Sequence, residues 1–201
     1  MSRPPRRAVP PLAREHACLD HAVQLLHQQQ GVIRDALDVV AIPVKTADQL
    51  ANVDALVIPG GESTTIGKMA ARFGLLEPLR VAIDEGLPVY GTCAGMIFLA
   101  GAVTEGDQPL VGSLDVVVKR NAFGRQNESF EADLEIAGLS EPFHAVFIRA
   151  PWIEKVGSEV EVLSEIGEHP VMVRQGRILA TSFHPELTGD GRVHQMLLEL
   201  I

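Results

Sequence analysis

Aromatic residues and cysteines are both scarce in this sequence. Seven Phe, one Trp and one Tyr make up only 4% of the 201 residues, so the core has to be built from Val, Ile, Leu and Ala. The hydrophobic fraction of 46% is ordinary for a globular enzyme. The two cysteines, Cys18 and Cys93, are too few and too far apart for a disulfide scaffold. We therefore expect a reducing, cytoplasmic compartment.

Positive charge and long apolar runs are missing as well. Seventeen basic residues against 26 acidic ones leave a net charge of -9, whereas a non-specific nucleic-acid binder needs a basic face. No apolar run approaches the roughly 18 residues that cross a bilayer. The basic start, Met1–Arg7, has no apolar stretch behind it, and its composition is typical of a disordered tail. We expect neither a nucleic-acid nor a membrane partner.

The order of apolar segments predicts an α/β fold. Ala55–Ile58 and Leu87–Tyr90 are short, wholly apolar runs, typical of strands that are buried on both faces of a parallel sheet. Thr64–Arg72 and Glu77–Glu85 have the pattern of helices. This β-α-β-α order predicts a parallel sheet with helices on both sides. The length suits one domain over residues 1–201, of which 1–37 are atypical.

Further elements are expected at both ends and in the second half. Helices are predicted at Leu12–Gln30, Met96–Val103 and Asp190–Ile201, an extended segment at Asp38–Val44, and a capping box at Thr46 and Gln49. Short strands rich in β-branched residues are predicted at Val116–Val118, Phe130–Ile136, Ala145–Ile148, Val160–Leu163, Val171–Val173 and Ile178–Phe183, with a hairpin turn at Gln175–Gly176.

Cys93 stands in Gly91-Thr-Cys-Ala-Gly95, between a predicted strand and an apolar helix. A nucleophile on a sharp strand-to-helix turn needs small neighbours two residues before and after it. The helix N-terminus stabilises a thiolate there. The alternative is that Cys93 is a small buried hydrophobe, as most free cysteines are. The surrounding strand and helix favour the nucleophile.

His184-Pro-Glu186 supplies a base for that thiol. Pro185 restrains His184 to extended dihedrals, in which residues two apart point to the same side. Glu186 would then orient one imidazole nitrogen while the other faces the thiol. The other six histidines are weaker candidates: we expect His169 in a solvated hairpin loop, His144 and His194 in structural or surface positions, and no metal site among His16, His21 and His27.

An oxyanion hole is expected at the ends of the two buried strands. If the Cys93 thiol attacks an amide and forms a thioester, negative charge develops on the amide oxygen, and hydrogen-bond donors must stabilise it. The backbone N–H groups at Gly60-Gly61 and at Ala94 would be those donors. Ligands of open α/β sheets gather at the carboxyl ends of strands. The alternative for Gly60-Gly61 is a plain turn. From the residues we assign Gly61 and Ala94 to the oxyanion hole.

Six blocks in this order resemble the class I (triad) glutamine amidotransferases, and more narrowly the glutaminase subunits of pyridoxal 5′-phosphate synthases. The blocks are Pro59-Gly-Gly-Glu-Ser-Thr-Thr65, Gly91-Thr-Cys-Ala-Gly95, Lys119-Arg-Asn-Ala-Phe-Gly-Arg-Gln126, Ser129-Phe-Glu-Ala-Asp133, Phe147-Ile-Arg-Ala-Pro151 and Ser182-Phe-His-Pro-Glu-Leu-Thr188. The resemblance covers roughly residues 38 to 201.

The resemblance implies a flavodoxin-like three-layer sandwich, with a mostly parallel central sheet and additional antiparallel strands in the C-terminal half. It implies a triad of Cys93, His184 and Glu186, and hydrolysis of L-glutamine through a cysteine thioester without a cofactor or metal. It implies glutamine contacts from Gly60, Gly61, Glu62, Arg120, Ile148 and Arg149. The alternative for Arg120 and Arg149, without the resemblance, is that they form surface ion pairs.

The expected partner is a synthase subunit that receives the ammonia in vitamin B6 biosynthesis within a large hetero-oligomer. We class the activity as both hydrolase and lyase.

The N-terminus departs from the family, whose first strand runs into Leu-Gln-Gly. Here Pro10 and Pro11 stand where that strand should be, and prolines oppose a central strand. Arg14-Glu-His16 nevertheless matches the helix that follows in the family. Two alternatives are a scaffold subunit without turnover and a different class I amidotransferase or cysteine hydrolase.

Overall fold

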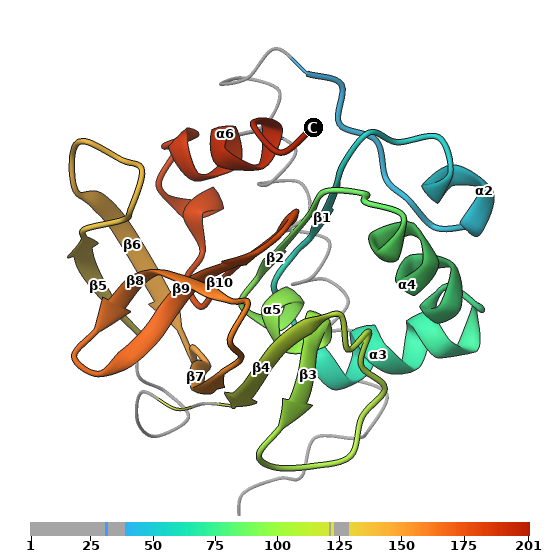
Figure 1. Cartoon of the computed structure of the whole chain (residues 1–201), viewed down its shortest axis with the longest axis horizontal. Helices are drawn as coiled ribbons and strands as arrows, with labels where there is room; N and C mark the ends of the chain where they lie inside the picture. Colours follow the sequence, from blue (N-terminus) through green and yellow to red (C-terminus); the bar gives the residue numbers. More distant parts are fainter. Residues whose placement is uncertain (1–30, 32–38, 121, 123–128) are drawn as a thin grey trace, which may run out of the picture.

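The computed structural model describes residues 31, 39–120, 122 and 129–201, which form a mixed α/β fold with several sheets (Figure 1). The α-helices of this part are α2 (Ala47–Leu50), α3 (Ser63–Arg72), α4 (Leu76–Asp84), α5 (Ala94–Leu99) and α6 (Arg192–Leu198), with a 3₁₀ turn, η1, at Pro185–Leu187. The helix expected at Leu12–Gln30 lies outside the described residues, as do residues 1–37 apart from Gly31.

Strands β1 (Leu56–Ile58), β2 (Val89–Thr92), β10 (Ile178–Thr181), β9 (His169–Gln175) and β8 (Glu161–Ile166) form a five-stranded sheet in that order. β1 and β10 both pair with β2 in parallel, whereas β9 pairs antiparallel with β10 and with β8. The expected antiparallel strands of the C-terminal half are therefore confirmed. Two of the four pairings are antiparallel, so "mostly parallel" overstates this sheet, because the turn at Gln175–Gly176 reverses the chain.

The smaller sheets complete the strands. β3 (Ala100–Val103), β4 (Leu114–Lys119) and β7 (Trp152–Val156) form one, and β5 (Ser129–Leu134) pairs antiparallel with β6 (Phe143–Ile148) in the other. β7 was not expected from the sequence, because its Glu154-Lys155 pair breaks the apolar pattern; in the structure only Ile153 of this strand is fully buried. Its partner β4 supplies the apolar face.

The five-stranded sheet has a hydrophobic core on each face, because side chains alternate along a strand. Val89 and Ile178 belong to one core, with α2, α4, α5 and β4, whereas their neighbours Tyr90 and Leu179 belong to the other, with β5, β6 and α6. In Figure 1, α6 and the β5–β6 pair lie to one side of β2 and β10, and α3 and α4 lie to the other. Both faces of the central strands are therefore buried.

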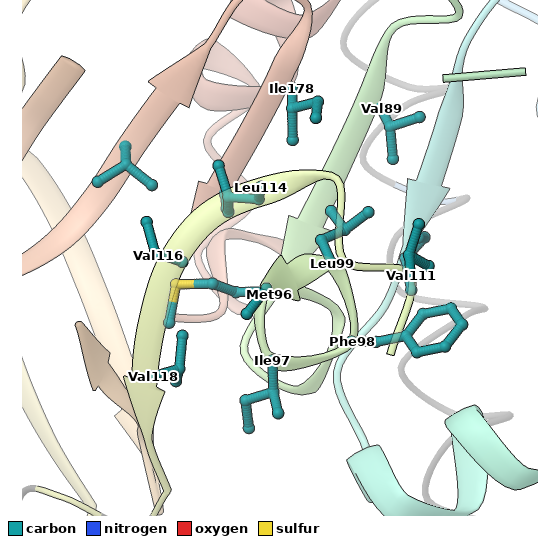
Figure 2. Packing of buried hydrophobic residues seen from close by; sticks show 14 of the residues in the cluster. Val89, Met96, Ile97, Phe98, Leu99, Val111, Leu114, Val116, Val118 and Ile178 are labelled. Carbon is teal, nitrogen blue, oxygen red and sulfur yellow. The ribbon is translucent and has the colours of Figure 1, made fainter. Parts of the chain in front are cut away.

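Helix α5 is apolar on every face, and core residues therefore surround it. Figure 2 shows Met96 directed toward Val116, Phe98 toward Val111 and Leu99 toward Val89. All six of its residues are buried, as expected for a helix without a polar face. The expectation that this helix continues to Val103 is wrong: it ends at Leu99, and the chain enters β3, which pairs in parallel with β4.

Other expectations near the described N-terminal part have mixed outcomes. The Thr46 hydroxyl accepts the N–H of Gln49 at 3.3 Å and caps α2, as predicted, but the Gln49 side chain accepts the N–H of Lys45. Residues 39–44 are not part of a strand.

The expectation that His169 lies in a loop is wrong, because His169 begins β9 and its ring stacks on Trp152 with centroids 3.7 Å apart. No helix in the described ranges is long and apolar enough to span a membrane.

Replacing Gly95 by Ala is expected to destabilise the fold. A Cβ at this position would lie 2.1 Å from the carbonyl oxygen of Ile58, so α5 would have to move away from the end of β1. Overpacking of this kind lowers the free energy of unfolding by about 1–3 kcal/mol. Urea unfolding measures the change. Gly101→Ala is the control, since its nearest backbone atom is at 3.4 Å; equal losses for the two variants would contradict the close contact.

Candidate active site

Cys93 occupies a strained turn between β2 and α5. Its φ of 49° and ψ of -101° are unusual for a residue with a side chain. The turn is fixed to the end of β10, because the Cys93 N–H donates to the Thr181 carbonyl at 2.7 Å. A Cβ at Gly91 would lie 2.7 Å from the carbonyl carbon of Gly95, so only a glycine fits there. The small neighbours that the sequence indicated are thus sterically required.

His184 lies between Cys93 and Glu186. Its Nδ1 is 2.9 Å from Glu186 Oε1, and its side chain also hydrogen-bonds Cys93. Both His184 and Glu186 are buried, at 2% and 4% exposure. Burial alone would lower the pKa of His184, but the charge and hydrogen-bond interactions with Cys93 and Glu186 outweigh burial and raise this pKa above its ordinary value. The arrangement therefore favours the protonated form of His184 beside Cys93.

The strands beneath the elbow carry a buried polar network. The Thr181 hydroxyl donates to the Phe183 carbonyl at 3.1 Å, so Tyr90 Oη, 2.9 Å away, donates to Thr181. Burial raises the pKa of Tyr90 well above its usual value, and the phenol stays neutral. His194 on α6 meets the Tyr90 ring edge-on, with centroids 5.7 Å apart. Burial lowers the pKa of His194 to about 4.

The two expected oxyanion-hole residues lie at the same end of the sheet. Ile58 and Gly91 are opposite each other in the parallel β1–β2 pair, so the chain segments that follow both strands leave the sheet together. Gly61 has a φ of 136°, which a residue with a side chain rarely adopts. Ala94 is the first residue of α5 and is buried. Gly60, Gly61 and Ala94 thus flank the thiol-bearing turn.

Glu62 and Arg120 form an ion pair near this end of the sheet. Glu62 Oε1 is 3.1 Å from Arg120 Nη2. The same carboxylate caps α3, accepting the N–H of Thr64 at 3.2 Å and that of Thr65 at 2.7 Å. Burial would raise the pKa of Glu62, but the hydrogen bonds from Thr64 and Thr65 hold it below its usual value. Glu62 is therefore an anion that already has a cationic partner.

The remaining two candidates, Ile148 and Arg149, lie where β6 ends. Arg149 has a φ of 49°, the second such non-glycine residue in the described part of the chain besides Cys93. The Ala122 N–H donates to the Ala150 carbonyl at 3.0 Å, which joins this segment to the one after Arg120. The His184 N–H donates to Val146 of β6 at 2.9 Å. Segments far apart in sequence are thus linked around Cys93.

Sequence reasoning missed several polar residues that support this arrangement. Tyr90 and Thr181 lie inside apolar strands, and an isolated hydroxyl in a buried run is the signal that could have indicated them. Gln108 lies in the loop between β3 and β4 and accepts hydrogen bonds from Ser63, Thr64 and Arg120. Nothing in the sequence around Gln108 indicates this, because its partners are 45 and 44 residues before it and 12 residues after it.

Comparisons with known proteins agree with one another. The family model described as SNO glutamine amidotransferase family matches residues 18–201. A protein of Frankia alni named pyridoxal 5′-phosphate synthase subunit PdxT is 60% identical over 181 residues, covering 86% of this chain and 91% of the relative. The protein of that name from Streptomyces avermitilis is 55% identical, with 86% and 90% covered. A crystal structure of a glutamine amidotransferase superposes with a TM-score of 0.83 at 49% identity, covering 87% of this chain and 92% of that one.

Cys93→Gly is expected to be more stable than Cys93→Ala. Both variants remove the thiol, but only glycine relieves the strained dihedrals, which cost of order 1–3 kcal/mol. Urea unfolding should place the glycine variant about 1 kcal/mol higher in free energy of unfolding. The neighbouring Ala94→Gly is the control and should lose stability, because Ala94 is helical. A glycine variant less stable than the alanine variant would show that the turn is unstrained.

The pH dependence of stability is expected to report on His194. Its folded pKa of about 4 lies below the ordinary 6.5, so the unfolded chain binds a proton first as the pH falls. The free energy of unfolding therefore has its full value above pH 6.5 and falls progressively as the pH is lowered to about 4. The loss is about 3 kcal/mol, from roughly 1.4 kcal/mol per pH unit. The unfolding free energies of parent and His194→Gln should diverge over this window; parallel curves would contradict a buried neutral imidazole.

Proposed function

This chain belongs to the SNO glutamine amidotransferase family, and we propose that it hydrolyses L-glutamine to L-glutamate and ammonia for a pyridoxal 5′-phosphate synthase. The chain covers about nine-tenths of the relatives that carry this name, at 55–60% identity. The observation that carries the proposal is the buried His184, which hydrogen-bonds both Cys93 and Glu186 at the elbow.

The reaction divides into acylation and deacylation. The Cys93 thiolate attacks the side-chain carbonyl carbon of glutamine, and the charge on its oxygen is held by the backbone N–H groups of Gly61 and Ala94. The His184 imidazolium then donates its proton to the leaving nitrogen, which departs as ammonia, and a γ-glutamyl thioester remains. His184, now neutral, takes a proton from water as it attacks the thioester, and glutamate leaves as the thiolate re-forms.

The charged residues around the elbow suit the amino-acid end of the substrate. Glu62 is an anion at the N-terminus of α3 and would bind the α-ammonium group. Arg120 or Arg149 would bind the α-carboxylate, since a guanidinium matches a carboxylate with two parallel hydrogen bonds. Gly60 and Ile148 would contact the substrate through the segments that follow β1 and end β6. Our proposal requires no metal and no cofactor of its own.

The expectation that the chain is also a lyase is wrong. Family and relatives place the chain as the glutaminase subunit of a synthase. Hydrolysis of a side-chain amide consumes water and is a hydrolase reaction, whereas a lyase breaks a bond without water.

The finer features of the assembly are part of the same proposal. The ammonia passes to a synthase subunit in a large hetero-oligomer that operates in the cytoplasm without nucleic acid. The fold is a flavodoxin-like three-layer sandwich, which the two hydrophobic cores on opposite faces of the sheet support. Residues 1–201 act as a single amidotransferase domain. The likeness in fold to a glutamine amidotransferase of 49% identity supports this layout.

Glutamine hydrolysis with and without the cognate synthase subunit tests the function. The parent should release glutamate with the partner present, Cys93→Ala should release none, and Glu186→Gln should lower kcat by about 10²–10⁴-fold while glutamine binding persists, because His184 loses its orienting carboxylate. Asp133→Asn is the matched control: Asp133 also binds a histidine, His144, at 2.8 Å, but on the exposed surface. Its activity should equal that of the parent.

The outcomes separate function from mechanism. A parent that forms the complex but releases no glutamate would overturn the enzyme assignment. Turnover that survives Cys93→Ala would overturn the thioester mechanism. Loss of glutamine binding in Glu186→Gln, in proportion to the loss of turnover, would assign Glu186 to the substrate instead of His184.

A further inference from the structure

We propose that Gln108 is a positioning residue that holds Arg120 in place to receive the α-carboxylate of glutamine. This inference rests on the proposed function, since it names a residue that prepares the same site for its substrate. Gln108 does not belong to any of the six family blocks, and it lies in the loop between β3 and β4. Its role follows from the way this loop is anchored and from the contacts of its side-chain amide.

The loop that carries Gln108 is fixed on three helices. A Cβ on Gly67 of α3 would lie 2.2 Å from the Pro109 carbonyl oxygen, so the loop backbone presses directly on that helix. Arg80 of α4 donates from Nε to the Val111 carbonyl and from Nη2 to the Leu110 carbonyl, both at 2.7 Å. The Val111 N–H donates to Phe98 of α5 at 2.8 Å. The backbone next to Gln108 is therefore held by contacts with α3, α4 and α5.

The Gln108 carbonyl oxygen ties Arg120 to the first turn of α3. It accepts the hydroxyl of Thr64 at 2.9 Å, that of Ser63 at 3.2 Å and Arg120 Nη1 at 3.4 Å. Arg120 Nη1 also donates to Thr64 at 3.3 Å. The guanidinium fixes the orientation of the amide, because turning it over would set the Gln108 NH₂ group against an N–H donor of Arg120. Arg120 thus has a neutral anchor in addition to Glu62.

Burial shields this anchor from water. Gln108 is only 8% exposed, so water does not readily compete for its carbonyl oxygen. Its Nε2 is buried as well and has no hydrogen-bond partner within the described ranges, so the amide is held by its oxygen alone. The hydrogen bonds to Ser63, Thr64 and Arg120 therefore set the position of the amide.

The anchor is needed because substrate binding takes Arg120 away from Glu62. At present the two side chains pair at 3.1 Å. When the α-ammonium pairs with Glu62 and the α-carboxylate with Arg120, the guanidinium exchanges one carboxylate for another. The hydrogen bonds to Gln108 and Thr64 persist through this exchange and keep a long, flexible side chain from losing its position. The benefit concerns the head group of the substrate, so it should affect binding and leave the chemical step unchanged.

A double-mutant cycle in the complex with the cognate synthase subunit tests this role. Glutamine affinity is measured by calorimetry in the Cys93→Ala background, and KM and kcat in the active background, for Gln108→Leu, Arg120→Ala and the pair. We expect Gln108→Leu to weaken glutamine binding and raise KM by about two- to twelve-fold, as for the loss of one ordinary hydrogen bond. The kcat should stay within about two-fold, and Gln108→Leu should add nothing once Arg120 is Ala.

Two further variants keep the test decisive. Gln108→Glu preserves the shape and the acceptor oxygen, but its charge competes with the α-carboxylate for Arg120, so KM should rise here as well. Gln175→Leu is the matched control, because the Gln175 side-chain oxygen also accepts a hydrogen bond, from the Asp115 N–H at 2.7 Å, but at the end of β9. Its KM should equal that of the parent, and iodoacetamide should alkylate Cys93 equally fast in every variant that retains this cysteine.

Glutamine affinity unchanged in both Gln108 variants would overturn the proposal. A loss that persists in full in the Arg120→Ala background would overturn it too, because Gln108 would then act through the general structure of the loop. Failure of the proposed function is distinguishable, since it shows as a parent that neither binds nor hydrolyses glutamine. Loss of kcat at unchanged affinity would place Gln108 in the chemical step and also contradict the proposal.

Discussion

The direct contact of α5 with the ends of β1 and β2 is the constraint on which the site depends. Gly95 allows the helix backbone to approach the Ile58 carbonyl, and Gly91 leaves room for the helix to turn back over β2. Cys93 is the residue between them, and its dihedrals are the consequence of that approach. Strain of this kind persists only where surrounding structure enforces it. Here the enforcement comes from an apolar helix buried on all sides and from the bond of Cys93 to Thr181.

The turn sets the electrostatics of the site. It brings the thiol to His184, whose other nitrogen binds a buried Glu186. An ion pair in an apolar interior is favourable only when its remaining polar atoms find partners. Glu186 and Cys93 provide them on either side of the imidazole. The second charged pair, Glu62 and Arg120, lies near the entrance to α3 and is only partly buried. In the function we propose, the buried pair would act on the amide of glutamine, and the partly buried pair would bind its zwitterionic head group.

Local patterns predicted those elements whose formation depends on neighbouring residues. The apolar runs of β1 and β2, the helices α3 and α4, the hairpin turn at Gly176 and the alternation in β5 were all expected from sequence and are found. The predicted site residues could be named because each lies in a short motif. β7 and the early end of α5 at Leu99 were missed, since both depend on pairing with β4, which is distant in sequence. Gln108 was missed for the same reason, because only the folded loop places it beside Ser63, Thr64 and Arg120.

The account rests on one claim, that Cys93 and no other group attacks the side-chain carbon of glutamine. The most direct measurement is covalent labelling with a glutamine analogue that carries a diazoketone in place of the amide, in the complex with the synthase subunit, followed by peptide mass spectrometry. The chain has two cysteines, Cys18 and Cys93, so the site of attachment is unambiguous. We expect one label per chain, on the peptide that contains Cys93, and protection by glutamine. Label on Cys18, or labelling that glutamine does not slow, would contradict the account.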